Sequence, residues 1–344
     1  MASPSPSLEI LFTGANQLEV RPVEPIRHPG PGEIAITCTR SLISTGTECT
    51  CLTRNFNPGS VWDGWVKYPF RSGYSVAGHV TEVGEGVTDL KPGDRIAVGA
   101  THARQAVVPA NEGTMPIVRI PDGINDDEAA WFNLACVAQI GVRRAEHELG
   151  DNVVLVGMGQ LGQLAVRYLR IWGANSIIAI DTAPARLEMA KRGGASHTLK
   201  MPVAEAKEAV AEITGGRLAD VVYDMTGHAG AFAPSLGMAR RFGKLILLSN
   251  PGKASDLCLT GDVFGRGVQV RAAHLGDPPW VANDHLYWTR RNMGKLFFNY
   301  LLDGRMRVAD LITNRYPPTE ARQAYDKLLT DRDNAMGIMF EWDR

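Results

Sequence analysis

The pattern of hydrophobic and polar positions divides the chain into two kinds of segment. In the first third, short alternating runs predict strands. Ile34, Ile36 and Cys38 face one way, while the residues between them face the other. Further strand-like runs cover residues 76–83, 94–99 and 105–110, with Pro-Gly turn signals between them. Many short strands at this spacing favour a small barrel or sandwich.

The pattern changes near residue 125. Residues 126–149 predict one or two linking helices, and beyond Asp151 apolar strands alternate with helical segments. The strand-like runs there are 153–157, 177–181, 220–224 and 244–249. Such alternation indicates βαβ units and a parallel sheet. The tail predicts a helix around residues 287–304, a second over 319–331 and a final strand over 336–342.

A glycine-rich loop follows the first strand of the alternating region. Gly157, Gly159 and Gly162 have the G-x-G-x-x-G spacing, and the next segment carries apolar residues at helical intervals. In a dinucleotide site these glycines allow a tight turn, close approach of a pyrophosphate and helix-on-strand packing. The helix start presents free N–H groups to phosphates, which brings Gln160 and Leu161 into the predicted site. A purely structural glycine turn is the alternative.

The second strand of this region ends in Asp181, at the place where the dinucleotide fingerprint requires an acidic residue. A carboxylate there accepts hydrogen bonds from ribose hydroxyls and repels a 2′-phosphate, so the predicted cofactor is NAD. Arg186 is the residue that could meet a phosphate, with a solvated helix arginine as the alternative. Ligands of such sheets bind at strand carboxyl ends. The residues predicted there are Thr226, Gly227, Ser249 and Asn250.

Composition narrows the class of protein. The 344 residues include 36 Lys and Arg against 37 Asp and Glu, so no global field favours nucleic acid or a membrane surface as a partner. Five cysteines are spread along the chain, which argues against a disulfide framework. No signal peptide or membrane-spanning run is visible. We therefore expect a cytoplasmic protein with reduced thiols and a small-molecule substrate.

These features together resemble the medium-chain dehydrogenase/reductase superfamily, also called the zinc-type alcohol dehydrogenase family. The resemblance rests on GYSVAGHVTEVGEGV, LKPGDRIAV, ARQAVVPA, the GMGQLG loop and RLEMAKRGGA. It implies an α/β protein: a GroES-like β-barrel catalytic domain plus a Rossmann domain with a doubly wound parallel sheet. The implied domains are 1–125 (catalytic), 126–274 (dinucleotide-binding) and 275–344 (return to the catalytic domain). It also implies a homo-oligomer, usually a dimer or tetramer, and places His274 near the nicotinamide, with a buried packing histidine as the alternative.

The chain departs from the zinc-dependent members of this family. Where they carry a first ligand Cys, this sequence has Thr45 within Thr45-Gly46-Thr47-Glu48, and Gly73-Tyr74-Ser75 replaces their Gly-His-Glu. Cys136 falls near the third ligand, but one thiolate does not hold zinc. The four-cysteine structural lobe is missing. We therefore expect no metal, and the sequence resembles the zinc-free branch, including the subgroup around bacteriochlorophyllide dehydrogenase.

Without a metal, a side chain must exchange a proton with the substrate oxygen. We expect Tyr74 to be the acid/base and Thr47, at the family's relay position, to pass the proton on. His102, in the contracted loop, is a further candidate. The alternatives are that Tyr74 fills the vacated volume, that Thr47 caps a helix and that His102 is a surface histidine.

The expected function is hydride transfer between NAD and a secondary alcohol or ketone. Aromatic residues around 55–70, with Trp280, Tyr287 and Trp288 in the tail, suggest a bulky or cyclic substrate, although a plain packed loop fits equally well. The alternatives are a quinone or enoyl C=C reductase of the same superfamily, a non-catalytic dinucleotide-binding protein, or an enzyme whose NAD never leaves.

Overall fold

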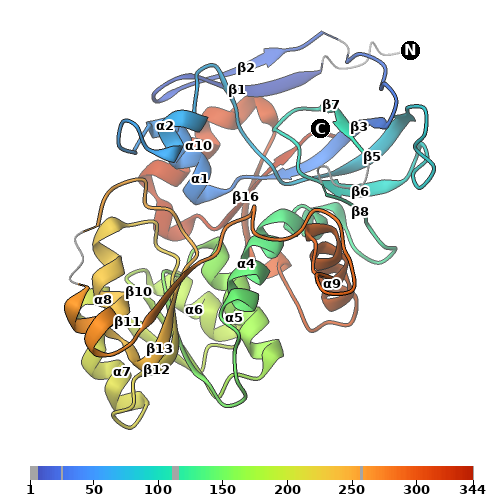
Figure 1. The fold of residues 1–344 in the computed structure, drawn as a ribbon. Coiled ribbons are helices and arrows are strands. Elements are labelled where there is room, and N and C mark those ends of the chain that lie inside the picture. The colour runs from blue at the N-terminus through green and yellow to red at the C-terminus, as the bar shows by residue number, and fades with distance from the viewer. Residues whose placement is uncertain (1–6, 25, 111–115, 256–258, 344) are drawn as a thin grey trace. The chain divides into compact units, whose positions relative to one another are not determined.

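A computed structural model describes residues 7–24, 26–110, 116–255 and 259–343 (Figure 1). Cys258 and the first six residues, which bore on the thiol and signal-peptide expectations, lie outside these ranges. The chain forms two compact units. Unit 1 comprises residues 1–55, 63–136 and 278–344, and unit 2 comprises residues 56–62 and 137–277.

Unit 1 is built on two sheets. The larger has the strand order β15-β16-β3-β5-β6-β8, and β7 pairs with β3 off this path. Its strands are β3 (Glu33–Leu42), β5 (Val76–Val83), β6 (Arg95–Val98), β7 (Gln105–Pro109), β8 (Ile117–Arg119), β15 (Ile312–Tyr316) and β16 (Gly337–Glu341). The smaller has the order β2-β1-β4, from β1 (Leu8–Gly14), β2 (Gln17–Pro22) and β4 (Phe70–Arg71). The predicted strands are present, and the smaller sheet was not foreseen.

The helices of unit 1 flank these sheets and include both predicted tail helices. They are α1 (Thr45–Thr53), α3 (Asp126–Ala129), α9 (Arg290–Leu302) and α10 (Ala321–Thr330), with short 3₁₀ turns η4 (Ala309–Leu311), η5 (Pro318–Glu320) and η6 (Arg332–Asn334). Two helices cross a unit boundary, α2 (Val61–Trp65) and α4 (Phe132–Arg144). Strand β16 pairs antiparallel with β3, so the end of the chain joins the sheet formed by its first third (Figure 1).

Unit 2 is a six-stranded parallel sheet in the order β11-β10-β9-β12-β13-β14. Its strands are β9 (Asn152–Val156), β10 (Ser176–Asp181), β11 (His197–Lys200), β12 (Ala219–Asp224), β13 (Ala239–Leu247) and β14 (Gln269–Ala272). Numbered within the unit, this is 3-2-1-4-5-6, the order of doubly wound dinucleotide folds. The order reverses between β9 and β12, where such folds bind their ligand. The predicted parallel sheet is confirmed.

Helical segments connect the strands of this sheet. They are α5 (Gln160–Trp172), α6 (Pro184–Gly193), α7 (Lys207–Ile213) and α8 (Phe232–Gly237), the 3₁₀ turns η1 (Val203–Glu205) and η2 (Ala229–Ala231), and the π-helical turn η3 (Thr260–Gly265). Val154, Ile178 and Val222, from three neighbouring strands, are fully buried in one core. These three strands, β9, β10 and β12, are buried almost throughout because both faces of a parallel sheet are covered.

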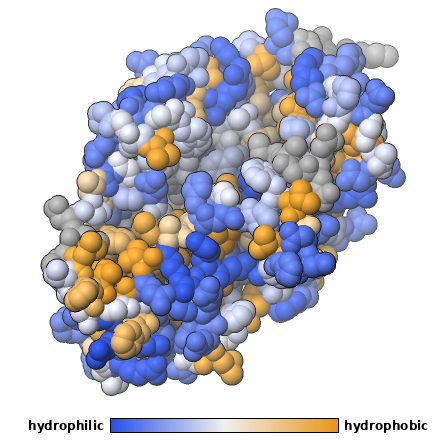
Figure 2. All heavy atoms as spheres, viewed as in Figure 1, coloured by the Kyte–Doolittle hydropathy of each residue, from blue (hydrophilic) through white to orange (hydrophobic). Residues whose placement is uncertain are grey.

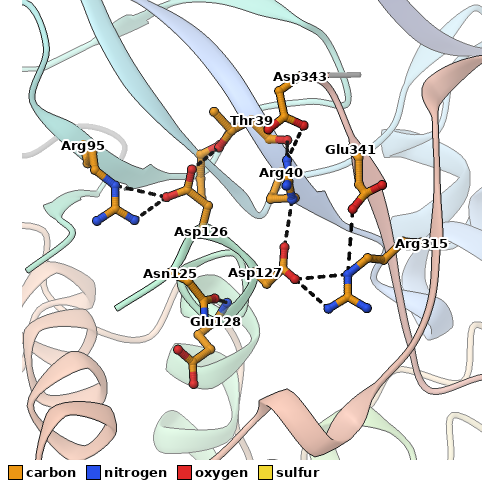
Figure 3. A network of polar contacts seen from close by, with 11 residues as sticks. Thr39, Arg40, Arg95, Asn125, Asp126, Asp127, Glu128, Arg315, Glu341 and Asp343 are labelled. Atoms are coloured by element: carbon orange, nitrogen blue, oxygen red, sulfur yellow. Dashed lines mark hydrogen bonds and ion pairs between the residues drawn. The ribbon is translucent and has the colours of Figure 1, made fainter. Parts of the chain in front are cut away.

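A network of charged residues ties the tail of the chain to the rest of unit 1 (Figure 3). Asp127, at the start of α3, accepts hydrogen bonds from Arg40 of β3 at 2.8 Å and from Arg315 of β15 at 2.6 Å. Burial raises the pKa of Asp127, but the two guanidinium groups outweigh it and hold that pKa below its usual value. Arg40 also donates to Asp343 at 2.5 Å. One half-buried carboxylate thus joins β3, α3 and the returning tail.

The surface is mostly hydrophilic on the face drawn in Figure 2, with apolar atoms gathered over the part of unit 2 around α8. Phe264 of η3 and the nearby Leu259 are exposed. Among the helices that the structure describes, none combines the length and apolarity needed to cross a bilayer.

Unit 2 also buries a His–Asp–Tyr arrangement away from the glycine-rich loop. His147 Nδ1 lies 3.0 Å from Asp151 Oδ2, and its Nε2 lies 2.6 Å from Tyr223 Oη. Burial lowers the pKa of His147 below 6.5, although Asp151 opposes the shift. The imidazole of His147 is therefore harder to protonate in the folded protein than in the unfolded chain.

We expect the free energy of unfolding to fall as the pH drops below about 6.5. The unfolded chain then binds a proton at His147 that the folded chain still resists. Urea unfolding at pH 7.5 and pH 5.5 measures the difference. His147→Gln should cost about 1–3 kcal/mol at pH 7.5, since it disturbs the buried partners, and should flatten the pH dependence. If the free energy of unfolding of His147→Gln changed with pH as steeply as that of the wild type, His147 would not be the source of the pH dependence.

Candidate functional site

Three hydroxyl groups meet in unit 1. Helix α1 begins after Ser44 and carries Thr47 in its first turn, and Tyr74 lies in the loop before β5. Tyr74 Oη is within hydrogen-bond distance of Ser44 Oγ and lies 3.3 Å from Thr47 Oγ1. One phenolic proton can serve only one of these oxygens, so the other contact needs a proton from the serine or threonine. The structure thus brings Tyr74 and Thr47 together and adds Ser44. Ser44, not Thr47, stands at the N-cap position of α1, and its side chain makes no capping hydrogen bond.

Burial sets the ionisation of the phenol. Burial is the main cause that raises the pKa of Tyr74 to about 12. The Glu48 carboxylate acts in the same direction, and the hydrogen bonds with Ser44 and Thr47 oppose the shift. Tyr74 is therefore a neutral hydroxyl at physiological pH. A neutral phenol can donate a hydrogen bond or a proton to a substrate oxygen that gains negative charge.

A buried polar cluster lies behind the hydroxyls. Glu48 is 1% exposed, and its carboxylate accepts from the Ser44 N–H at 2.7 Å and from Tyr325 Oη at 2.5 Å. His102 Nε2 lies 2.9 Å from the same carboxylate, and its Nδ1 lies 2.7 Å from Ser41 Oγ. His102 is 0% exposed, so the surface-histidine alternative is wrong. Both of its ring nitrogens already have protein partners, which leaves no free nitrogen to touch a substrate.

The residues at the expected metal position do not fit zinc. Within the described ranges, no group of three or more His, Cys, Asp or Glu side chains is placed to hold a metal ion. Thr45, Thr47 and Tyr74 offer hydroxyls, whereas zinc sites use thiolate, imidazole or carboxylate ligands. Burial raises the pKa of the Cys49 thiol to about 12, which disfavours the thiolate that zinc requires. Cys136 Sγ donates to the Arg290 carbonyl at 3.5 Å.

The glycine-rich loop of unit 2 has the geometry of a pyrophosphate cradle. Gly157 adopts a φ of +92°, which a side chain rarely allows. A Cβ on Gly162 would lie 2.2 Å from the Gly157 carbonyl oxygen, so only glycine lets α5 pack this closely on β9. Nothing lies within 4 Å of a Cβ built on Gly159, at the start of α5. This open space at a helix N-terminus suits a phosphate.

Asp181, at the end of β10, hydrogen-bonds to the glycine-rich loop. Its two carboxylate oxygens accept from the Met158 N–H at 2.7 Å and from the Ala183 N–H at 2.9 Å. Each oxygen has a second lone pair that can accept from a ribose hydroxyl. The residues present therefore fit a dinucleotide.

The predicted residues on the next two strands also come together. Thr226 donates its hydroxyl to Asp224 Oδ1 at 2.8 Å, and the Gly227 N–H donates to Ser249 Oγ at 2.9 Å. Asp224 is buried, and burial raises its pKa. These contacts fix the turns after β12 and β13, at the carboxyl edge of the sheet. Asn250 instead accepts from the Gly252 N–H within its own turn, at 2.9 Å.

The other predicted residues have less specific surroundings. Gln160 is buried at the start of α5, and Leu161 is half-buried. Arg186 is half-buried with a buried Nε, so it is not a freely solvated helix arginine. His274 is exposed, and its Nδ1 accepts from the Gly276 N–H at 3.1 Å. The buried-histidine alternative for His274 is therefore wrong.

The aromatic segment packs largely on itself. Phe56 stacks on Trp62 at 6.3 Å within unit 2, and in unit 1 Trp65 meets Phe70 edge-on at 5.2 Å. Tyr68 donates to the Cys51 carbonyl at 2.7 Å. In the tail, the aromatic residues are exposed or nearly so: Trp280, Tyr287 and Trp288.

Sequence reasoning missed Ser44, Glu48 and Tyr325 as members of the site. Ser44 and Glu48 flank the Thr45–Thr47 stretch, so their place in the motif was a usable signal. Tyr325 carried no such signal, because it lies 277 residues from Glu48 along the chain.

Two domain models match the chain. The model described as the alcohol dehydrogenase GroES-like domain matches residues 42–119, and that of the zinc-binding dehydrogenase matches residues 161–285. A sorbitol dehydrogenase of Bacillus subtilis is 25% identical over 94% of this chain and 93% of its own length. A D-guloside 3-dehydrogenase of Escherichia coli is 28% identical over 71% and 69%.

Solved structures share the fold. A zinc-dependent alcohol dehydrogenase from Streptococcus pneumonia superposes with a TM-score of 0.84 at 19% identity, covering 98% of this chain and 99% of that one. An alcohol dehydrogenase from E. coli complexed with NADH gives a TM-score of 0.79 at 20% identity, covering 98% and 100%. A dehydrogenase from Sinorhizobium meliloti bound to NADP gives 0.78 at 19%, covering 98% and 99%. The expected GroES-like and Rossmann domains are thus confirmed, and the chain belongs to the medium-chain dehydrogenase/reductase superfamily of NAD(P)-dependent oxidoreductases.

Proposed function

We propose that this protein is a zinc-independent, NAD-preferring dehydrogenase that interconverts a secondary alcohol and a ketone. The observation that carries the proposal is the contact of Tyr74 with Ser44 and Thr47. By the family resemblance, Tyr74 stands where zinc-dependent members carry a histidine ligand. A hydroxyl cluster can exchange a proton with a substrate oxygen. In zinc-dependent members of the family, the metal would instead act on that oxygen as an electrophile.

The proposed mechanism divides the work between the two units. NAD(H), when bound, supplies or accepts the hydride. Gly157, Gly159 and Gly162 would receive its pyrophosphate, and Asp181 would accept from its ribose hydroxyls. Tyr74 would donate a proton to the carbonyl oxygen during reduction. The half-buried Thr47 would relay a replacement proton from water to the phenol, accepting one proton as it passes its own on. His102 has no free ring nitrogen and would act through Glu48.

The relatives suggest the substrate class. Two relatives are named as dehydrogenases of sorbitol and, at position 3, of a D-guloside. We propose a polyol or a cyclic sugar derivative, which agrees with the bulky or cyclic substrate expected from the aromatic segments. Sorbitol, a methyl hexoside and 2,3-butanediol form a first panel of probe alcohols.

Replacement of Tyr74 tests the proton donor. Tyr74→Phe keeps the ring but removes the hydroxyl, and it should lower kcat by about 10²–10⁴-fold on any probe that the wild type turns over. Steady-state kinetics with each alcohol, and with the matching ketone and NADH, measure the loss. Tyr68→Phe is a matched control, because Tyr68 donates to a backbone carbonyl of α1 outside the hydroxyl cluster. Full activity in Tyr74→Phe would overturn the assignment, as would no turnover of any probe by the wild type.

Metal removal tests zinc independence separately. Because the hydroxyl cluster lacks zinc ligands, dialysis against 1,10-phenanthroline should leave kcat unchanged, and purified protein should contain far less than one zinc per chain. Elemental analysis and activity before and after dialysis provide the measurement. Stoichiometric zinc whose removal abolishes turnover would show that a metal replaces the proposed Tyr74 chemistry.

Coenzyme preference tests the role of Asp181. The carboxylate repels a 2′-phosphate, so NADH should bind at least about tenfold more tightly than NADPH. Asp181→Asn should weaken NADH binding by about tenfold and reduce the preference for NADH over NADPH. Fluorescence titration of both coenzymes gives the dissociation constants. If NADPH binds more tightly to the wild type and Arg186→Gln removes that preference, Arg186 rather than Asp181 determines the coenzyme.

A further inference from the structure

Beneath the hydroxyl cluster, one buried acid–histidine pair touches both segments that carry the hydroxyls. The first segment is the start of α1, with Ser44 and Thr47. The second is residues 72–74, which end in Tyr74. Glu48 holds the first segment, and His102 holds the second.

Glu48 fixes the start of the helix. Its Oε1 accepts the Ser44 N–H at 2.7 Å, so the carboxylate binds the backbone of the residue whose hydroxyl meets Tyr74. Its Oε2 accepts from Tyr325 and lies 2.9 Å from His102 Nε2. A carboxylate with no exposed surface must keep such donors, because losing one leaves buried charge without compensation. The start of α1 is thereby locked to His102.

His102 fixes the tyrosine segment. Its backbone N–H donates to the Ser72 carbonyl at 2.8 Å. Gly73 packs against the His102 ring, since a Cβ on Gly73 would lie 2.7 Å from Cγ and Cδ2 of His102. Gly73 also has a φ of +90°. Only glycine permits this approach. The backbone immediately before Tyr74 therefore rests on the imidazole.

Counting donors and acceptors gives the tautomer. Trp342 Nε1 can only donate, and it donates to Ser41 Oγ at 2.8 Å. Glu48 accepts, so His102 Nε2 carries a proton toward it. The Ser41 hydroxyl then donates its proton to His102 Nδ1, since the described residues give that hydroxyl no other hydrogen-bond acceptor. The neutral Nε2–H form satisfies every group in the cluster.

We propose that the Glu48–His102 pair is a positioning clamp that sets the distance between Tyr74 and the hydroxyls of Ser44 and Thr47. This inference rests on the proposed function of Tyr74 as proton donor. Neither clamp residue touches the substrate. Their effect on the reaction passes through the phenol, whose misplacement by about 1 Å can slow an enzyme on the order of 100-fold.

A double-mutant cycle tests the clamp. Glu48→Gln keeps the size of the side chain but turns an amide N–H toward one of the donors, so kcat should fall by about 10–100-fold with the dissociation constant of NADH unchanged. In a Tyr74→Phe background the same change should cost less than about threefold, because the phenol is already gone. If Glu48→Gln lowered kcat by the same factor in both backgrounds, the clamp would be overturned.

The cycle separates this inference from the proposed function. If Tyr74→Phe is fully active, the proposed function fails. If Tyr74→Phe is slow but Glu48→Gln is neutral or additive, only the clamp fails. His147→Gln is a matched control, since it also breaks a buried His–carboxylate pair, 3.0 Å long, but in unit 2. Any fall in kcat caused by His147→Gln should be the same in the wild-type and Tyr74→Phe backgrounds.

Two further measurements keep the test informative if Glu48→Gln folds poorly. A glutamine at position 102 can place an N–H near Nε2 and keep the Glu48 contact, whereas an asparagine reaches only the Nδ1 position. His102→Gln should therefore retain more activity than His102→Asn, and the reverse order would overturn the clamp. Hydrogen exchange should also accelerate at Ser44 and over residues 72–74 in His102→Asn. Acceleration at neither segment would contradict a joint clamp.

Discussion

The architecture of unit 1 depends on one buried carboxylate. Glu48 has almost no exposed surface, and its charge is compensated by Ser44, Tyr325 and His102. These donors come from the start of α1, from the tail helix α10 and from the short loop after β6. Because an uncompensated buried charge costs several kcal/mol, the three segments must assemble together. The return of the tail to the first third of the chain is thus a condition for burying Glu48.

In the proposed zinc-independent site, this arrangement would keep the hydroxyl cluster rigid without metal ligands. A zinc ion orders its ligands by direct bonds, and neutral hydroxyls cannot be ordered in that way. Here the Ser44 N–H donates to Glu48, and the His102 N–H donates to the carbonyl of Ser72, two residues before Tyr74. In the proposed site, buried residues of the unit would thus order the hydroxyls, and the hydroxyls would remain able to contact a substrate.

Local signals accounted for most of the fold and for half of the candidate site. The β9 strand, the glycine loop and α5 were predictable because strand periodicity, glycine spacing and the helical apolar face all lie within about twenty residues. The β1–β4 pairing was not predictable, since it joins Phe12 to Phe70 across the unit. Nor was the burial of His102, which depends on Ser41, Glu48 and Trp342. Such contacts are set by tertiary packing and leave no periodic trace in the sequence.

The same carboxylate also bears on the direction of proton transfer. Glu48 adds to the effect of burial in raising the pKa of Tyr74, so the phenol keeps its proton at neutral pH. A site that only abstracted protons would gain from a cation at this position, yet the residue next to Thr47 is acidic. In the proposed mechanism, this favours a protonated Tyr74 that would donate to a carbonyl oxygen as negative charge develops there.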